Sequence, residues 1–303
     1  MKKGAGRHPK LLLEVTKLRG LLLAAGEGSR IRKVTYGAFP KELLPIGNVP
    51  TIRFPLEALR LADINSVMVV IAAQTKHGIV DGLQSGRKFN MDLCYVIQEK
   101  GENLSGGLGS AILTARGWLA GEDFAVALGD TIVCNLFGDN PMDCLKPLVE
   151  VHRRTHSIAT VLTYPTKLDP KRYGVAKLRD LRRENGYMFG EVERLVEKPE
   201  DKVLSSLQTD GYYYVIAGYY IFNSSIFDYI EKTQPDKRNE VQITDAIQLA
   251  AENGQRVSAA VHARCHNGTL LPLEYWDVGI PEDYRKANVT LLNENIDKWL
   301  SSE

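Results

Sequence analysis

The sequence has little of what marks several large protein classes. Its 303 residues carry 38 basic and 37 acidic side chains, a net charge of +1, so no overall charge favours nucleic acid or an anionic membrane as a partner. Its four cysteines stand far apart, without the spacing of a zinc site or a disulfide scaffold. The apolar run nearest the start, Leu11–Leu13, is too short for a signal peptide or a membrane span. We expect a globular protein of the reducing cytoplasm.

Apolar runs and helical patterns alternate through the first half of the chain. The predicted strands are Leu18–Ala24, Ser66–Ala72, Leu93–Ile97 and Phe124–Leu128, and the predicted helices are Thr51–Leu61, Thr75–Leu83, Ser110–Leu119 and Asp143–Arg154. Strands that are apolar throughout are buried on both faces, so the pattern predicts an α/β fold with a doubly wound, mostly parallel sheet. Ligands of such folds bind at the carboxyl ends of the strands.

The second half of the chain is less regular. We expect strands over Ile158–Tyr164, Gly174–Leu178 and Tyr212–Phe222, a turn region over Asp180–Tyr187, a helix over Asp245–Glu252 capped by Thr244, and a last helix from Pro281 to about Leu292. No linker and no repeat of about 20–50 residues separates the halves. This favours one domain over 18–295, with halves of about 18–150 and 151–295, after an N-terminal extension over 1–17.

A glycine-rich turn, Gly26-Glu27-Gly28-Ser29-Arg30, follows the first predicted strand. Such a turn lets backbone N–H groups approach phosphates, although a tight connection that needs positive φ explains it too. The dinucleotide fingerprint fails because its third glycine would fall at Ile31, which disfavours a nicotinamide-dependent dehydrogenase, and no Gly-Lys-Ser/Thr of a Walker A loop is present. Arg30 and Lys41 place two cations near the glycines, which suits a triphosphate.

This turn and the run from Pro40 to Ile46 (PKELLPI) together resemble the signature of the sugar nucleotidyltransferases, also called nucleotide-sugar pyrophosphorylases. Further matches follow in the family's order: Gly107–Gly109, Leu128–Asp130, Tyr173–Val175, Glu197–Pro199, Glu240–Ile247 and Asp277–Gly279. The resemblance covers about Leu18 to Asn288. It implies a Rossmann-like nucleotidyltransferase fold with inserted sugar-binding β elements.

The resemblance also implies an activity. A nucleoside triphosphate and a hexose 1-phosphate would form a nucleotide sugar and pyrophosphate, with Mg²⁺ as cofactor, in a homo-oligomer. The strings PKELLP, GLGSA and QITDAI are most similar to UTP–glucose-1-phosphate uridylyltransferases, with glucose-1-phosphate thymidylyltransferases as near neighbours. A catalytically inactive paralogue that binds nucleotide sugars is a further alternative.

Site residues follow from the resemblance, position by position. It implies catalytic roles for Arg30 and Lys41; nucleotide contacts for Ala25, Gly26, Gly28, Gln98 and Gly109; sugar-phosphate contacts for Gly174, Glu197 and Lys198; and metal ligation by Asp130 and Asp277. Taken alone, Asp130 could cap a helix, Asp277 could belong to a turn, and Glu197 and Lys198 could be a solvated charged pair. An insertion from Glu99 to Ser105 follows Gln98 and is longer than the family usually has.

Overall fold

A computed structural model describes residues 17–72, 76–99, 104–184, 186–266, 269–292 and 294–300. Apart from Lys17, the predicted N-terminal extension lies outside these residues. So do Thr75, at the predicted start of the second helix, and residues 100–103 of the insertion after Gln98.

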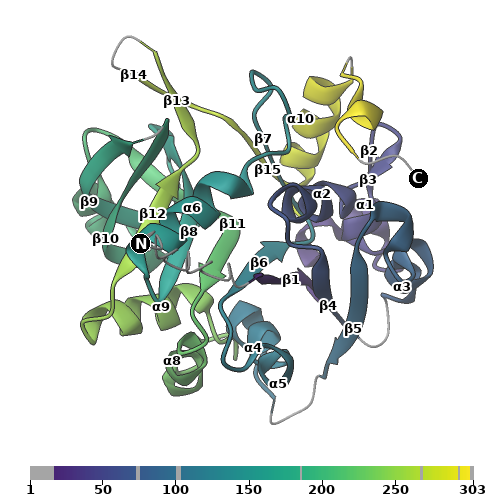
Figure 1. The fold of residues 1–303 in the computed structure, drawn as a ribbon, viewed down its shortest axis with the longest axis horizontal. Coiled ribbons are helices and arrows are strands. Elements are labelled where there is room, and N and C mark those ends of the chain that lie inside the picture. Colours follow the sequence, from purple (N-terminus) through teal and green to yellow (C-terminus); the bar gives the residue numbers. More distant parts are fainter. Residues whose placement is uncertain are drawn as a thin grey trace, which may run out of the picture.

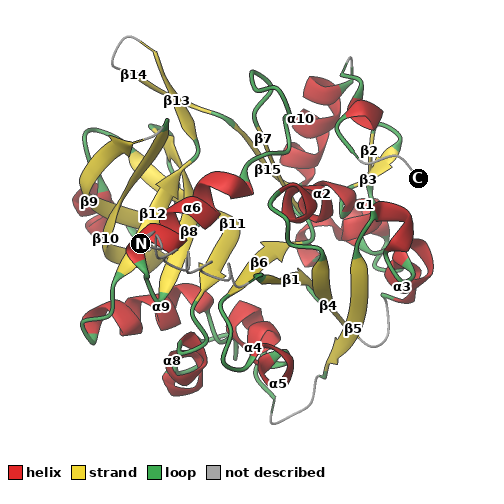
Figure 2. Ribbon diagram, in the orientation of Figure 1, coloured by secondary structure: helices red, strands yellow, loops and turns green. Residues whose placement is uncertain are grey.

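The described elements alternate as the sequence pattern predicts (Figures 1 and 2). The strands are β1 (Arg19–Ala24), β2 (Pro45–Ile46), β3 (Val49–Pro50), β4 (Ser66–Ala72), β5 (Asp92–Gln98), β6 (Phe124–Leu128), β7 (Thr131–Cys134), β8 (Ala159–Thr166), β9 (Gly174–Glu184), β10 (Tyr187–Glu197), β11 (Tyr213–Phe222), β12 (Val257–Val261), β13 (Ala263–His266), β14 (Thr269–Pro272) and β15 (Glu274–Asp277). The α-helices are α1 (Arg32–Thr35), α2 (Arg53–Leu61), α3 (His77–Leu83), α4 (Gly107–Leu113), α5 (Arg116–Leu119), α6 (Leu145–Thr155), α7 (Asp201–Leu204), α8 (Ile226–Lys232), α9 (Ile243–Glu252) and α10 (Pro281–Leu291).

One nine-stranded sheet runs through both halves of the chain, in the order β5-β4-β1-β6-β11-β8-β12-β10-β9. The first four strands are parallel neighbours, and so are β8 and β12. Strand β11 enters antiparallel between β6 and β8, and β10 pairs antiparallel with β12 and β9. The predicted doubly wound α/β fold is confirmed, with antiparallel strands added in the second half.

Both faces of the sheet are buried along its central strands, such as β1 and β6, as their continuous apolar runs require. Along β1, Leu22 and Ala24 belong to one core cluster, whereas Leu21 and Leu23 belong to the other. Residues of α2, α3, α6 and α10 pack into the first cluster, and residues of α4, α8 and α9 into the second. Figure 1 shows α4, α8 and α9 on one side of the sheet and α2, α6 and α10 on the other. Because successive strand residues point to opposite faces, each apolar run needs both helix layers.

Three local predictions in the chain are corrected. The turn expected over Asp180–Tyr187 is wrong, because β9 continues to Glu184 and the turn begins only after it. Thr244 does not cap its helix, since α9 already begins at Ile243 and Gln242 stands at its N-cap. The single helix expected over Ser110–Leu119 is two helices, α4 and α5, interrupted between Leu113 and Arg116.

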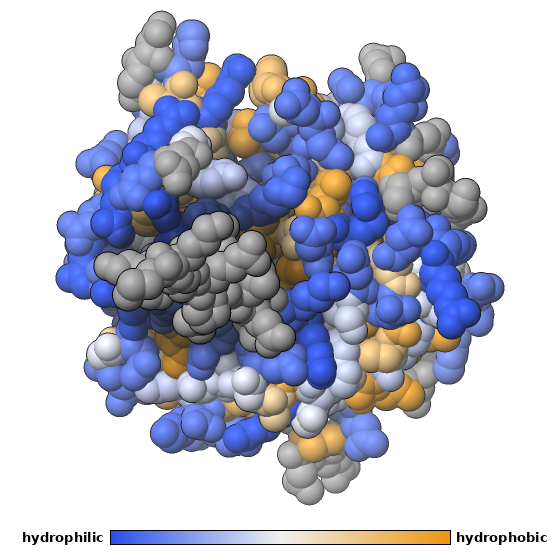
Figure 3. All heavy atoms as spheres, in the orientation of Figure 1, coloured by the Kyte–Doolittle hydropathy of each residue, from blue (hydrophilic) through white to orange (hydrophobic). Residues whose placement is uncertain are grey.

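The surface and the cysteines agree with a globular protein. The face in Figure 3 is mostly hydrophilic, with apolar side chains in small separate groups. Among the described residues, no helix combines the length and the apolar character that crossing a membrane requires. All four cysteines are free thiols, and Cys134 and Cys144 are buried.

Candidate active site

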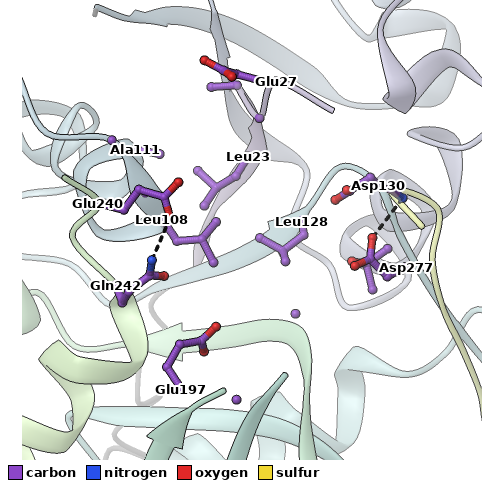
Figure 4. Close-up of a pocket in the computed structure, with 18 of the residues that line it drawn as sticks. Leu23, Glu27, Leu108, Ala111, Leu128, Asp130, Glu197, Glu240, Gln242 and Asp277 are labelled. Carbon is purple, nitrogen blue, oxygen red and sulfur yellow. Dashed lines mark hydrogen bonds between the residues drawn. The ribbon is translucent and has the colours of Figure 1, made fainter. Parts of the chain in front are cut away.

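A cavity of about 1020 Å³ opens at the carboxyl ends of β1, β5 and β6 and extends to the ends of β9 and β10. Its lining includes all the predicted site residues except Gly109: Ala25, Gly26, Gly28, Arg30, Lys41, Gln98, Asp130, Gly174, Glu197, Lys198 and Asp277. The fold therefore brings together residues from almost the whole length of the chain. Figure 4 shows Asp130 and Asp277 close together on one side of this pocket, with Leu128 between them and Glu197.

The glycine turn after β1 gives Lys41 its path into the pocket. Gly28 has φ +68°, a conformation that favours glycine. A Cβ on Gly26 would lie 3.0 Å from the Lys41 ammonium, and a Cβ on Gly28 would touch the Lys41 side chain at 3.4 Å. The interpretation as a tight connection that needs positive φ is therefore confirmed at Gly28, and the approach of the turn to phosphate stays a prediction. Both glycines also leave room for the Lys41 side chain.

Gly109 stands behind the pocket wall rather than in it. Its N–H donates a 2.9 Å hydrogen bond to the Val241 carbonyl, and a Cβ there would lie 2.7 Å from Val241 Cγ1. The wall itself includes Gly106 and Gly107, and Gly107 has φ +92°. Gly109 thus permits close packing against Val241, while its own N–H group is already bonded inside the protein.

Asp130 and Asp277 meet through strand pairing. Asp130 lies between β6 and β7, and Asp277 ends β15, which pairs antiparallel with β7 so that Asp277 faces Thr131. The Val278 N–H donates a 2.9 Å hydrogen bond to the Asp130 carbonyl. A Cβ on Gly279 would lie 2.9 Å from Asp277 Oδ1 and 3.0 Å from Asp130 Oδ2, so the two carboxylates flank one point in space.

Each of these carboxylates is paired with a cation. Arg30 Nη2 donates to Asp277 Oδ2 at 2.9 Å, and the Lys41 ammonium donates to Asp130 Oδ2. Burial acts to raise the pKa of Asp130, but the charge of Lys41, its hydrogen bond and the charge of Arg30 together outweigh burial, and the pKa is lowered. For Asp277, burial and the negative charge of Asp130 prevail over Arg30, and the pKa is raised. Burial would lower the pKa of Lys41, yet the charges of Asp130 and Glu42 raise it, so the lysine stays protonated.

The two carboxylates fit a hard divalent cation. Mg²⁺ is bound through one or two protein carboxylates, with its other positions filled by water and substrate phosphate. Among the described residues, no group of three or more His, Cys, Asp or Glu side chains could enclose a metal. Two oxygen anions at the wall of an open pocket would suit a metal shared with a substrate better than a closed structural site.

The opposite end of the pocket is built on paired strands. Gly174 opens β9, Glu197 ends β10, and the two are register partners. Thr244 donates a 3.1 Å hydrogen bond to Glu197 Oε2, and a Cβ on Gly174 would lie 3.1 Å from the same oxygen. Lys198 follows with φ +46°, held by a 3.1 Å bond from its N–H to the Tyr173 carbonyl. A non-glycine residue in this conformation is strained, and such strain is concentrated at functional sites.

Gln98 lies at the carboxyl end of β5, beside Ala72 at the end of β4. It is buried, lines the pocket, and makes no side-chain hydrogen bond to any other residue that the structure describes. A buried amide that is not bonded within its own protein is suited to bind a ligand.

Several residues that shape the site were assigned no role in it from the sequence. Thr244 orients Glu197, Gly279 leaves room between the two aspartates, and Glu42 and Lys76 form a buried ion pair at the wall of the pocket. Glu42 and Gly279 lie within the strings that carry the family resemblance, so those strings could have indicated them. Lys76 had no such signal, because only the fold brings it to Glu42.

Known proteins are similar to this chain in sequence and in fold. The family model described as "Nucleotidyl transferase" matches residues 19–294. The chain is 32% identical over 251 residues to UTP–glucose-1-phosphate uridylyltransferase of Staphylococcus epidermidis, which covers 76% of this chain and 80% of that protein. It is 29% identical over 279 residues to the low-salt glycan biosynthesis nucleotidyltransferase Agl11 of Haloferax volcanii, covering 91% of this chain and 67% of Agl11.

A thymidylyltransferase and a solved structure are similar as well. Glucose-1-phosphate thymidylyltransferase of Streptomyces griseus is 29% identical over 244 residues, and the match spans 80% of this chain but only 60% of that protein. The crystal structure of a UDP-glucose pyrophosphorylase complexed with UDP-glucose aligns with a TM-score of 0.72 and 26% identity, over 92% of this chain and 100% of that one.

Proposed function

Since the chain belongs to the nucleotidyl transferase family of sugar-phosphate nucleotidyltransferases, we propose that it joins UTP and glucose 1-phosphate to form UDP-glucose and pyrophosphate. One observation carries this proposal. A single pocket is lined at one end by two cations and two carboxylates, and at the other end by Gly174, Glu197 and Lys198. That arrangement suits a triphosphate next to a sugar phosphate, with the reacting atoms between them.

In the proposed reaction a phosphate oxygen of the sugar 1-phosphate attacks the α-phosphorus of the nucleotide, and pyrophosphate leaves. Both reactants carry their own reactive groups, so the chain positions them and neutralises charge, and no covalent intermediate with the protein is needed. Lys198 would hold the sugar phosphate, while Glu197 would accept hydrogen bonds from sugar hydroxyl groups. Arg30 and Lys41 would bind the triphosphate and stabilise negative charge as it develops.

Asp130 and Asp277 would hold Mg²⁺. When bound, the cation supplies charge neutralisation between carboxylate and phosphate oxygens, which would otherwise repel one another. Arg30 and Lys41 are paired with the two carboxylates. With Mg²⁺ held by the aspartates, these two cations would be available to phosphate oxygens.

Two alternatives share most of this site. A thymidylyltransferase would use dTTP in place of UTP, and Gln98 would form hydrogen bonds with the same imide edge of either base. An inactive nucleotide-sugar-binding paralogue would bind the product without turnover. Two neighbouring ion pairs, Arg30–Asp277 and Lys41–Asp130, support an active enzyme. A protein that only bound nucleotide sugars would not need carboxylates beside the cations that bind phosphate.

The experiment is a matrix of nucleoside triphosphates against sugar 1-phosphates in the presence of Mg²⁺, with pyrophosphate release as the measured quantity. We expect the highest kcat/KM for UTP with glucose 1-phosphate. A preference for dTTP would identify the thymidylyltransferase. No release with any pair, together with binding of nucleotide sugars, would leave the inactive paralogue.

A further inference from the structure

A buried ion pair stands at the wall of the pocket, with Glu42 in the lining and Lys76 behind it, and the proposed reaction does not use it. Lys76 Nζ lies 2.5 Å from Glu42 Oε2, and the two side chains are only 3% and 1% exposed. Glu42 belongs to the 3₁₀ turn Lys41–Leu43, and Lys76 stands at the N-terminal boundary of α3, beyond the carboxyl end of β4. The two residues therefore come from separate crossover connections on the same edge of the sheet.

The stability of the fold does not explain this pair. Removing two charges from water costs several kcal/mol per ion, and well-packed apolar side chains of similar volume commonly do as well or better. The first core cluster surrounds this region with aliphatic residues, among them Leu44, Ile71 and Ile79, so apolar replacements would suit the place. Because apolar side chains could take its place, a charged pair beside the site calls for another explanation.

Its position supplies one. Glu42 follows Lys41 in the chain, and it lines the pocket. A Cβ on Gly129, the residue before Asp130, would lie 3.2 Å from Glu42 Cγ and 3.1 Å from the Leu23 carbonyl. The Glu42 side chain thus fills the space between the turn that carries Lys41 and the turn that carries Asp130. The Ile52 N–H also donates a 2.8 Å hydrogen bond to the Glu42 carbonyl, which fixes the backbone of the same turn.

The charges in this region alternate. Lys76 is paired with Glu42, Glu42 is next to Lys41, and Lys41 is paired with Asp130. When substrate phosphate takes the place of Asp130 as the partner of Lys41, Lys41 loses that bond within the protein. Glu42 remains next to Lys41 as a negative charge, and its ion pair with Lys76 holds it in place.

We propose that the Glu42–Lys76 pair is a positioning device for Lys41, which keeps the ammonium in place while its partner changes from Asp130 to a phosphate oxygen. Lys76 acts through Glu42 and does not touch the substrate. The proposal rests on the proposed function, because it assumes that Lys41 binds the triphosphate.

The test compares two double variants. In Glu42→Met/Lys76→Met both charges are replaced by apolar chains of similar length, so the melting temperature stays close to that of the wild type. We expect kcat to fall by ~10–100-fold, with the KM for the sugar 1-phosphate unchanged, since a misplaced group near the reacting atoms costs this much. The control is Glu57→Met/Arg60→Met, which replaces an ion pair on α2, outside the pocket, whose carboxylate is 3% exposed. We expect this variant to keep the kcat of the wild type.

Rescue separates positioning from general packing. Lys76→Arg keeps a cation opposite Glu42, and we expect it to retain kcat within about threefold, whereas Lys76→Met alone does not. If the double methionine variant fails to fold, Glu42→Gln replaces it, because the amide still fills the space and still accepts from Lys76. Wild-type kcat in a folded double variant, or in a folded Glu42→Gln, overturns the proposal.

The turnover of the wild type and the ratio of the variant kcat to the wild-type kcat answer different questions. Pyrophosphate release by the wild type tests the proposed function, and the ratio tests the positioning role. If the wild type binds nucleotide without turnover, calorimetric affinity for UTP with Mg²⁺ replaces kcat, and the double methionine variant should bind ~10-fold more weakly. Equal affinities would overturn the positioning role while leaving nucleotide binding in place.

Discussion

The Val278 N–H donates a 2.9 Å hydrogen bond to the carbonyl of Asp130, and this bond holds together the two chain segments that carry the candidate metal ligands. Because Val278 directly follows Asp277, the bond fixes the two carboxylates beside one another. It continues the β7–β15 pairing by one step. The position of the aspartates therefore depends on backbone pairing more than on side-chain rotamers, and neutral replacements of either carboxyl group should leave the fold intact.

Replacement of either aspartate by asparagine should abolish most turnover without unfolding the protein. Asp130→Asn and Asp277→Asn each keep the shape but remove the anion, and we expect kcat to fall by ~10²-fold or more, as when one electrostatic contact to a transition state is lost. The double variant should lose far less than the sum of the two effects, because both carboxylates act on one cation. EDTA should abolish wild-type pyrophosphate release, and added Mg²⁺ should restore it.

The matched control is Asp180→Asn on the exposed part of β9, which should leave kcat unchanged. Near-normal turnover in Asp130→Asn or Asp277→Asn, or full wild-type activity in EDTA, would return both aspartates to a structural role.

Gly174→Ala should weaken binding of the sugar phosphate specifically. The new methyl group would lie 2.9 Å from Ile216 Cδ1 and 3.1 Å from Glu197 Oε2, so the carboxylate must move. We expect the KM for the sugar 1-phosphate to rise ~10-fold, and the KM for the nucleotide to change little, because displacement of a positioning group is costly. Gly117→Ala is the control, since its methyl group would meet nothing within 4 Å. An unchanged KM in Gly174→Ala would exclude Glu197 from sugar binding.

Gln98→Ala tests how the base is recognised. Gln98 is 9% exposed, lines the pocket, and makes no side-chain hydrogen bond to another described residue. UTP and dTTP present the same imide edge, so both should bind more weakly by about 1–3 kcal/mol, the cost of leaving a polar edge unpaired. Calorimetric titration of each nucleotide measures the loss, with the exposed Gln208→Ala as control. If Gln98→Ala keeps its full preference for pyrimidines, this residue does not read the base.

His262 should give the protein an acid-labile component of stability. Burial lowers the pKa of His262 from 6.5 to about 4, and its Nε2 lies 3.2 Å from the Cys134 carbonyl. Between these two pH values the unfolded chain binds the extra proton and the folded protein does not. The contribution of neutral His262 is therefore complete above pH 6.5 and declines as the pH falls towards 4, by about 3 kcal/mol in total.

His262→Gln keeps a side chain that can donate to the Cys134 carbonyl and removes the titration. Urea unfolding of the two proteins at several pH values should show a smaller loss of stability in the variant between pH 6.5 and 4. Parallel pH profiles for the two proteins would contradict this assignment.

The amino-acid sequence was enough to predict the sheet strands of the first half and to name almost all of the candidate residues that line the pocket. Ser66–Ala72 and Phe124–Leu128 form strands with the predicted bounds, because strands buried on both faces must be apolar throughout. The prediction failed where burial is low. Most residues of β9 beyond Leu178 are exposed and polar, and they resemble a turn in composition although they continue the strand.

Tertiary structure alone decided which residues meet. Strand register places Gly174 opposite Glu197, and β15 brings Asp277 back to Asp130 after most of the chain has intervened. The tertiary structure also places Gly109 behind the pocket wall and pairs Lys76 with Glu42. In it, Thr244 donates a hydrogen bond to Glu197 and does not cap a helix. The physical reason is that local propensity depends on neighbours in the sequence, whereas contacts of a side chain depend on the pairing of strands that are distant in the sequence.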